Sequence, residues 1–208
     1  MADAHGELLN VYDAEGAVVG ALPRDEAKRS GLAVGAVNIL LANADGQVLL
    51  QRRASDKENG GLWDKSVGGH VLAGEGFDQT AVREAGEELF DDAGSPRVVL
   101  AADAAQLRDR LAAAGPRQTV VFRHASLQRN LRDVRHCPDG ALLNVVYHVS
   151  IYLGRTDVPL ESFRPPAGEI AGLGYFAPRA VDEMLLRGEL APNMAFLWLT
   201  HANALLDR

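Results

Sequence analysis

The sequence has little cysteine and no long hydrophobic run. Cys137 is the single cysteine in 208 residues, so no disulfide forms within the chain, and we expect a reducing, cytoplasmic setting. No stretch reaches the roughly 18 apolar residues of a membrane span. The first six residues also lack the basic segment and apolar core of a secretory signal. We therefore expect no association with a membrane.

Positive charge is also scarce. Lysine and arginine number 21 against 28 aspartates and glutamates, which gives a formal net charge of −7. This balance argues against a protein that binds nucleic acid through its phosphates. A small polyanionic ligand would need metal ions and a few well-placed basic residues to offset the repulsion.

Hydrophobic patterning predicts an α/β (α+β) fold, with a mixed sheet and helices on its faces. Alternating or β-branched runs predict strands over 8–12, 18–22, 36–42, 48–53, 119–124, 143–153 and 169–176. Helical spacing predicts helices over 78–90, 102–114, 178–187 and 192–206. The polar segments 23–30 and 165–168 read as connections, and the polar segment 129–140 reads as an excursion from the core fold.

Acidic residues crowd the predicted helix over 78–90. A helical wheel puts its apolar side chains in one stripe and three glutamates on a different side: Glu84, Glu87 and Glu88. Like charges at this spacing repel by a few tenths of a kcal/mol per pair. The acidic face therefore needs either open solvent or a cation, and grouped carboxylate oxygens suit Mg²⁺ or Mn²⁺. Asp78 is the predicted N-cap and Gly94 the predicted stop of this helix.

The segment starting at residue 69 resembles the Nudix box, G-x5-E-x7-R-E-U-x-E-E-x-G-U, where U is a bulky apolar residue. Six fixed positions match at the right intervals: Gly69, Glu75, Arg83, Glu84, Glu87 and Glu88. Phe90 replaces the last glycine and Asp91 the last apolar residue. Both departures follow the carboxylates, so they concern the end of the helix rather than the metal site.

This resemblance implies a Nudix-type α/β/α sandwich with a loop–helix–loop metal site. We expect a single Nudix domain over 1–208, with an N-terminal hairpin extension over 7–30 and an insertion over 94–141. By resemblance, Mg²⁺ (or Mn²⁺) would be bound by Glu84, Glu87, Glu88 and the carbonyl group of Gly69.

The resemblance also assigns supporting and catalytic roles. Glu75 would support the metal site from the loop, and Arg83 would hold the carboxylates by ion pairing. The general base in the family is either a box glutamate, such as Glu87, or a glutamate on a later loop. Glu169, before the last predicted strand, is the candidate at the later position.

Upstream residues resemble the branch that contains isopentenyl diphosphate isomerases and their hydrolase-like relatives. Among them are Gln51-Arg52-Arg53, Lys57 and Leu62-Trp63-Asp64. The isomerase needs a cysteine just before its glycine–histidine pair and a histidine on an earlier strand. This chain has Gly68 and Val34 at those positions, so the resemblance favours hydrolysis over isomerisation.

Four residues are candidates for substrate binding: Arg52, Arg53, Lys57 and His70. The three cations are suited to phosphate oxygens, and His70 matches an isomerase metal ligand that here either packs or touches substrate. Because adjacent strand residues face opposite ways, Arg52 and Arg53 cannot both serve one site.

The sequence thus predicts an Mg²⁺-dependent hydrolase of a diphosphate linkage in a nucleoside diphosphate derivative or related small diphosphate. A non-catalytic nucleotide-binding or regulatory domain and the isomerase are the alternatives. The resemblance leaves open a homodimer, because many proteins with this fold pair.

Overall fold

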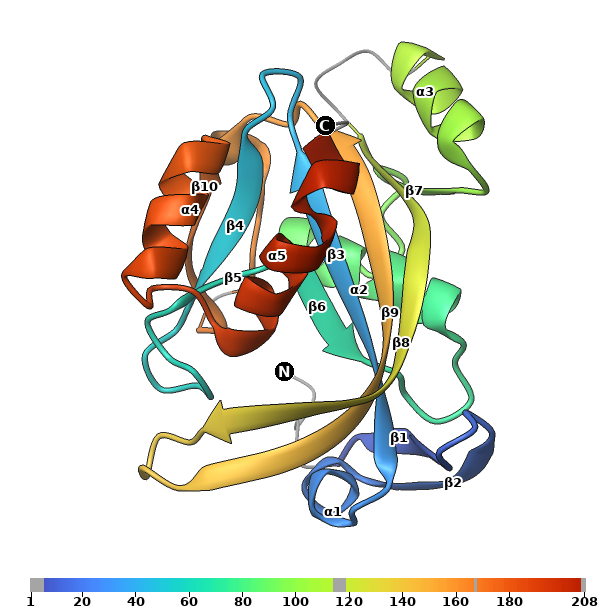
Figure 1. Cartoon of the computed structure of the whole chain (residues 1–208). Helices are drawn as coiled ribbons and strands as arrows, with labels where there is room; N and C mark the ends of the chain where they lie inside the picture. The colour runs from blue at the N-terminus through green and yellow to red at the C-terminus, as the bar shows by residue number, and fades with distance from the viewer. Residues whose placement is uncertain (1–5, 114–118, 167, 207–208) are drawn as a thin grey trace.

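One mixed sheet forms the centre of the molecule (Figure 1). The computed structural model describes residues 6–113, 119–166 and 168–206. Within them a 10-stranded sheet has the main order β10-β4-β3-β9-β8-β7. Strand β3 (Ala33–Ala42) runs parallel to β9 (Leu142–Thr156), whereas β8 and β9 pair antiparallel. The predicted mixed-sheet α/β class is confirmed.

The other elements follow the chain in a simple order. The strands are β1 (Leu8–Tyr12), β2 (Val18–Pro23), β4 (Val48–Arg53), β5 (Trp63–Asp64), β6 (Val67–His70), β7 (Val98–Ala101), β8 (Val120–His136) and β10 (Ile170–Phe176). The helices are α1 (Arg24–Arg29), α2 (Phe77–Phe90), α3 (Ala104–Ala113), the 3₁₀ turn η1 (Leu160–Ser162), α4 (Pro178–Leu186) and α5 (Pro192–Leu206). Among the described helices, none is long and apolar enough to cross a membrane.

The sheet buries both of its faces, which gives the α/β/α layering. On β3, Ile39 and Leu41 pack into the cluster that includes α2, while Leu40 packs on the opposite face with α4 and α5. Successive strand residues point to opposite faces, so one strand serves both cores. Helix α2 contributes the buried Ala85 and Leu89 and is thereby fixed against the sheet. The carboxylate face of α2 is positioned by this packing.

The predicted connection 23–30 and the predicted excursion 129–140 both contain regular structure. Segment 23–30 contains helix α1, which is only 6 residues long and is therefore too short for its periodicity to stand out. Segment 129–140 belongs mostly to strand β8, which a turn at 137–141 joins to β9. We call residues 133–145 the arm, because they extend beyond the last pairing of β9 with β3 at Val146.

Residues 133–142 of the arm were not predicted as strand because most of them are solvent-exposed and show no apolar alternation, whereas 143–145 lie in the predicted strand 143–153. Three predictions fall partly outside the described residues. They are the loop at 165–168, which includes residue 167, the helix end at residue 114, and the insertion 94–141, which includes 114–118.

Candidate metal and substrate site

The bounds of helix α2 agree with the predicted 78–90 to within one residue, but its capping residues differ from the prediction. Gly76, not Asp78, occupies the N-cap position, and the Asp78 carboxylate accepts a hydrogen bond of 2.7 Å from the Tyr152 hydroxyl. The helix ends at Asp91, whose left-handed φ of 53° makes Gly94 unnecessary as a stop. Aspartate tolerates this conformation better than most residues. The hydrogen bond from Tyr152 ties the first turn of α2 to the sheet.

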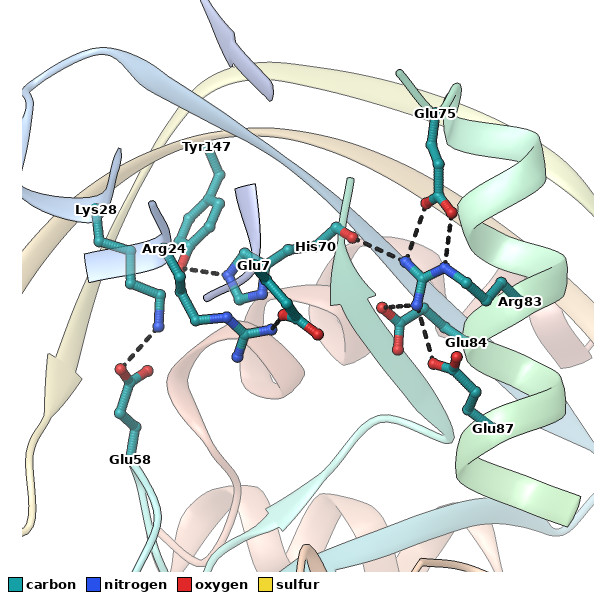
Figure 2. A network of polar contacts seen from close by, with 10 residues as sticks. All are labelled: Glu7, Arg24, Lys28, Glu58, His70, Glu75, Arg83, Glu84, Glu87 and Tyr147. Carbon is teal, nitrogen blue, oxygen red and sulfur yellow. Dashed lines mark hydrogen bonds and ion pairs between the residues drawn. The ribbon is translucent and has the colours of Figure 1, made fainter. Parts of the chain in front are cut away.

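Arg83 is the centre of an ion-pair network (Figure 2). Its guanidinium donates to both oxygens of Glu75, at 2.9 and 3.0 Å, and to Glu87 at 2.9 Å. It also lies 3.0 Å from Glu84 Oε1 and donates to the carbonyl oxygen of His70 at 3.2 Å. Burial opposes the charge, but these carboxylates raise the pKa of Arg83 further. One permanent cation therefore joins the loop, the helix and β6.

Glu75 is the fixed point of the loop before α2. Its carboxylate also accepts a hydrogen bond of 2.7 Å from the Thr80 hydroxyl. Burial alone would raise its pKa, but the hydrogen bonds from Arg83 and Thr80 lower it. Glu75 therefore stays ionised and anchors Arg83.

Two other glutamates of α2 lie against the backbone of β6. A Cβ atom on Gly69 would lie 1.9 Å from the Glu84 carboxyl carbon, so only glycine leaves room for that carboxylate. Glu88 Oε2 accepts a hydrogen bond of 3.0 Å from the Gly68 N–H and one of 3.3 Å from the Gln51 side chain. Both carboxylates are thus held at one edge of β6.

The pKa values of Glu84 and Glu88 are both raised. Burial, with repulsion from Glu87, raises the pKa of Glu84 to about 7. Burial, with repulsion from Glu84, raises the pKa of Glu88 to about 8. Desolvated carboxylates that repel each other need a cation to remain ionised at neutral pH. Their hard oxygen atoms suit Mg²⁺ or Mn²⁺.

Glu87 is more exposed than this pair, although Arg83 Nη1 contacts both its carboxylate and that of Glu84. Its side chain is 43% exposed and its carboxylate faces Arg83. Accordingly, within residues 6–113, 119–166 and 168–206, no three carboxylate, histidine or cysteine side chains converge as a metal site. A site built from Glu84, Glu87 and Glu88 requires Glu87 to turn away from Arg83.

Of the predicted phosphate-binding cations, Arg52 and Arg53 point to opposite sides of β4, as strand alternation requires. Arg53 pairs with the buried Asp64 at 3.2 Å. The charges of Asp64 and of its neighbour Lys65 act in turn on the pKa of Glu88. Arg52 lies instead over the Trp63 ring, 6.0 Å from its centroid, and donates to the carbonyl oxygen of Gly61. Lys57 is exposed in the loop after β4. Of the three, the structure brings only Arg53 toward the box.

A buried lysine was missed by the sequence analysis. Lys65 Nζ lies 3.1 and 3.2 Å from the two oxygens of Asp64, and its side chain is only 6% exposed. A Cβ atom on Gly68 would lie 2.0 Å from Lys65 Cε, so the lysine stem fills the space beside Gly68. The adjacent pair Asp64-Lys65 carries no periodic signal that would have revealed it.

His70 lies among positive charges. Its Nε2 is 3.5 Å from the Tyr147 hydroxyl, and Arg135 lies over the Tyr147 ring, 5.4 Å from its centroid. Burial, followed by the charges of Lys28 and other nearby cations, holds the pKa of His70 well below its usual range. Neighbouring cations disfavour a metal ion at His70 and favour an anion.

Glu169 lies in the turn before β10. Its carbonyl oxygen accepts a hydrogen bond of 3.2 Å from the N–H of Ala54, just after β4. The side chain is exposed, and no hydrogen bond or ion pair holds it among the residues that the structure describes. Its role as general base stays a prediction.

These features define a class of protein: an α/β/α domain with a glutamate-bearing helix held against a glycine-rich strand. Residues 32–132 match the family model of the NUDIX domain. The crystal structure of DR0079 from Deinococcus radiodurans has the same fold, with a TM-score of 0.62 at 23% identity over 93% of this chain and 98% of that one.

Curated relatives agree with this match. An uncharacterized Nudix hydrolase of Pseudomonas aeruginosa is 39% identical over 89 residues, which are 42% of this chain and 53% of that protein. An isopentenyl-diphosphate Delta-isomerase of Photorhabdus laumondii is 32% identical over 87 residues, 41% of this chain and 49% of that protein. Residues 32–132 therefore form a Nudix domain, and the chain spans about half the length of these relatives.

Proposed function

We propose that this chain is a metal-dependent hydrolase of a diphosphate linkage, in a nucleoside diphosphate derivative or a related small diphosphate. The observation that carries the proposal is the pair Glu84 and Glu88. Both carboxylates are largely buried against the Gly68-Gly69 backbone, and burial raises the pKa of each by more than the nearby cations Arg83 and Lys65 lower it. Such a pair costs folding free energy that a bound cation would recover.

The donor set fits Mg²⁺, or alternatively Mn²⁺. Glu84 and Glu88 would hold the ion, together with Glu87 after it leaves Arg83 and with the carbonyl oxygen of Gly69. When bound, the ion would neutralise the diphosphate and polarise its phosphorus atom. Gln51 would keep Glu88 oriented through the hydrogen bond that it already donates.

The protein's own groups would supply positioning and proton transfer. Arg83 fixes the relative positions of the loop, α2 and β6 through its contacts with Glu75 and with the carbonyl oxygen of His70. A glutamate with solvent access would take the proton of the attacking water. Glu87 and Glu169 are the two candidates, since the side chain of each reaches solvent.

Hydrolysis is favoured over isomerisation by the surroundings of Gly68. Moving a proton on carbon would require the thiol that the isomerase carries at this position, and here the stem of Lys65 fills the adjacent space. Cys137, the single cysteine, lies in the turn at the tip of the arm. A purely regulatory domain is disfavoured because every box carboxylate is present.

A product-release panel tests the proposal. Nucleoside diphosphate derivatives, dinucleotide cofactors and prenyl diphosphates would be incubated with the protein, with and without Mg²⁺. Glu88→Gln is the test variant, and Glu183→Gln is the control because Glu183 forms only exposed ion pairs on α4. We expect metal-dependent release that Glu88→Gln abolishes. No release, together with equal Mn²⁺ binding by wild type and Glu88→Gln, would overturn the assignment.

A further inference from the structure

Three buried nitrogen donors without a hydrogen-bond acceptor lie outside the box. They are Arg24 Nε in α1, Asn59 Nδ2 in the loop after β4, and Arg135 Nε in the arm. Arg135 Nε is 2.8 Å from an Asp133 oxygen, but not in hydrogen-bond alignment. Buried donors nearly always have a partner. Within the described residues the only other buried unpaired side-chain atom is an acceptor, Asn193 Oδ1.

These donors come from segments that meet one another. The Asn59 backbone N–H donates to the carbonyl oxygen of His136 at 3.0 Å, and the His136 N–H donates to Asn59 Oδ1 at 3.2 Å. Those bonds join the arm to the loop. The next residue back in the loop, Glu58, pairs with Lys28 of α1 at 2.8 Å. We call Arg24, Lys28, Asn59 and Arg135 the basic cluster.

The cations of the basic cluster are largely desolvated. The side chains of Lys28 and Arg135 are 6% and 11% exposed, and that of Arg24 is 29% exposed, which leaves one side open to solvent. Each cation also pairs with a carboxylate, Arg24 with Glu7, Lys28 with Glu58 and Arg135 with Asp133, but Arg24 Nε is left without a hydrogen-bond acceptor. A buried cation with a free donor favours an anionic acceptor over a neutral one.

The basic cluster adjoins the box across His70 (Figure 2). Arg24 and Lys28 lie on one side of His70, and Arg83 with its glutamates lies on the other. The carbonyl oxygen of His70 is bound by Arg83, while its ring nitrogen Nε2 lies 3.5 Å from the hydroxyl of Tyr147, over whose ring Arg135 lies. Anionic groups of one small ligand would therefore reach both the box and the cluster.

We propose that the basic cluster is a subsite for a free terminal phosphate, so that the preferred substrates are organic diphosphates esterified at one end only. This inference rests on the proposed function and names its substrate class. A terminal phosphate presents three free oxygens and up to two negative charges, whereas a doubly esterified phosphate presents two oxygens and one charge. The several donors and cations of the cluster match the former.

Metal-free binding separates this subsite from the box. Calorimetry in EDTA would compare inorganic pyrophosphate with ADP-ribose, whose diphosphate is esterified at both ends. We expect pyrophosphate to bind and Arg24→Gln to weaken it about tenfold or more, the usual cost of losing a charged hydrogen bond. Arg179→Gln is the matched control, because Arg179 is 91% exposed on α4 and should leave the affinity unchanged.

A second variant guards against a folding defect. Lys28→Met combined with Glu58→Gln removes a buried cation without leaving its partner charged, and should also weaken pyrophosphate. Mn²⁺ binding measured by electron paramagnetic resonance should be unchanged in both cluster variants. Pyrophosphate affinity equal to wild type in Arg24→Gln, no metal-free binding by wild type, or equal affinity for ADP-ribose would each overturn the subsite.

The outcome is distinguishable from failure of the proposed function. Glu88→Gln should lose Mn²⁺ binding yet keep its metal-free affinity for pyrophosphate. If the product-release panel is silent while Arg24→Gln still weakens pyrophosphate, the hydrolase assignment fails and the subsite stands. If hydrolysis is metal-dependent but indifferent to Arg24→Gln, the reverse holds.

Discussion

Replacing Glu88 by glutamine should stabilise the metal-free protein while removing its response to metal. Glutamine keeps the side-chain shape and can still accept the hydrogen bond from the Gly68 N–H. What is lost is a largely buried negative charge whose pKa is raised from 4.5 to about 8.

The pH dependence has a definite sign. The folded pKa lies above the unfolded value, so the folded state binds more protons between pH 4.5 and about 8. The free energy of unfolding of the metal-free wild type therefore falls as pH rises through this window. At pH 8 the charge of Glu88 costs about 1–3 kcal/mol, because the neighbouring Glu84 shares the titration.

Differential scanning calorimetry in EDTA provides the assay. For a protein of this size we expect the Tm of Glu88→Gln to exceed that of wild type by roughly 2–10 °C at pH 8, and by little at pH 4.5. Added Mn²⁺ should raise the Tm of wild type and of the control Glu183→Gln but not that of Glu88→Gln. Equal Tm values at pH 8, or equal stabilisation by Mn²⁺, would refute the reasoning.

Three further substitutions test the site. Arg83→Met leaves three carboxylates without their cation and should lower the free energy of unfolding by about 2–4 kcal/mol in urea denaturation, whereas an unchanged midpoint would deny it a structural role. Gly69→Ala displaces the Glu84 carboxylate and should weaken Mn²⁺ binding about tenfold or more; Gly76→Ala, whose Cβ meets nothing within 4 Å, is its control. Glu169→Gln should reduce kcat while leaving the affinity for Mn²⁺ unchanged. An unaltered kcat would show that Glu169 is an ordinary solvated residue and not the general base.

The box and its helix were predictable because their information is local. Fixed spacing placed three glutamates on one side of α2, and apolar spacing placed Ala85 and Leu89 in the core, as the structure has them. The capping residues of the helix were not predictable. The Asp78 side chain bonds Tyr152, 74 residues away, and so is not available as a cap.

The basic cluster could not be predicted from the sequence, for a physical reason. Its contacts join residues far apart in the chain, such as Lys28 with Glu58 and Asn59 with His136. No periodicity links such positions, and the exposed part of the arm has no apolar alternation that would predict a strand. The predicted cation Lys57 lies instead in an exposed loop.

The proposed metal-dependent hydrolysis is tested most directly by product release from the best diphosphate of the panel. The rate would be measured for wild type and for Glu88→Gln across a titration of Mg²⁺. Loss of an electrostatic element of this kind typically costs roughly 3–4 kcal/mol of barrier, or about 10²–10³ in rate. We therefore expect release by wild type that requires Mg²⁺, and a rate lower by that factor in Glu88→Gln. Release that is independent of Mg²⁺, or equal rates for the two proteins, would contradict the assignment of the reaction to this site.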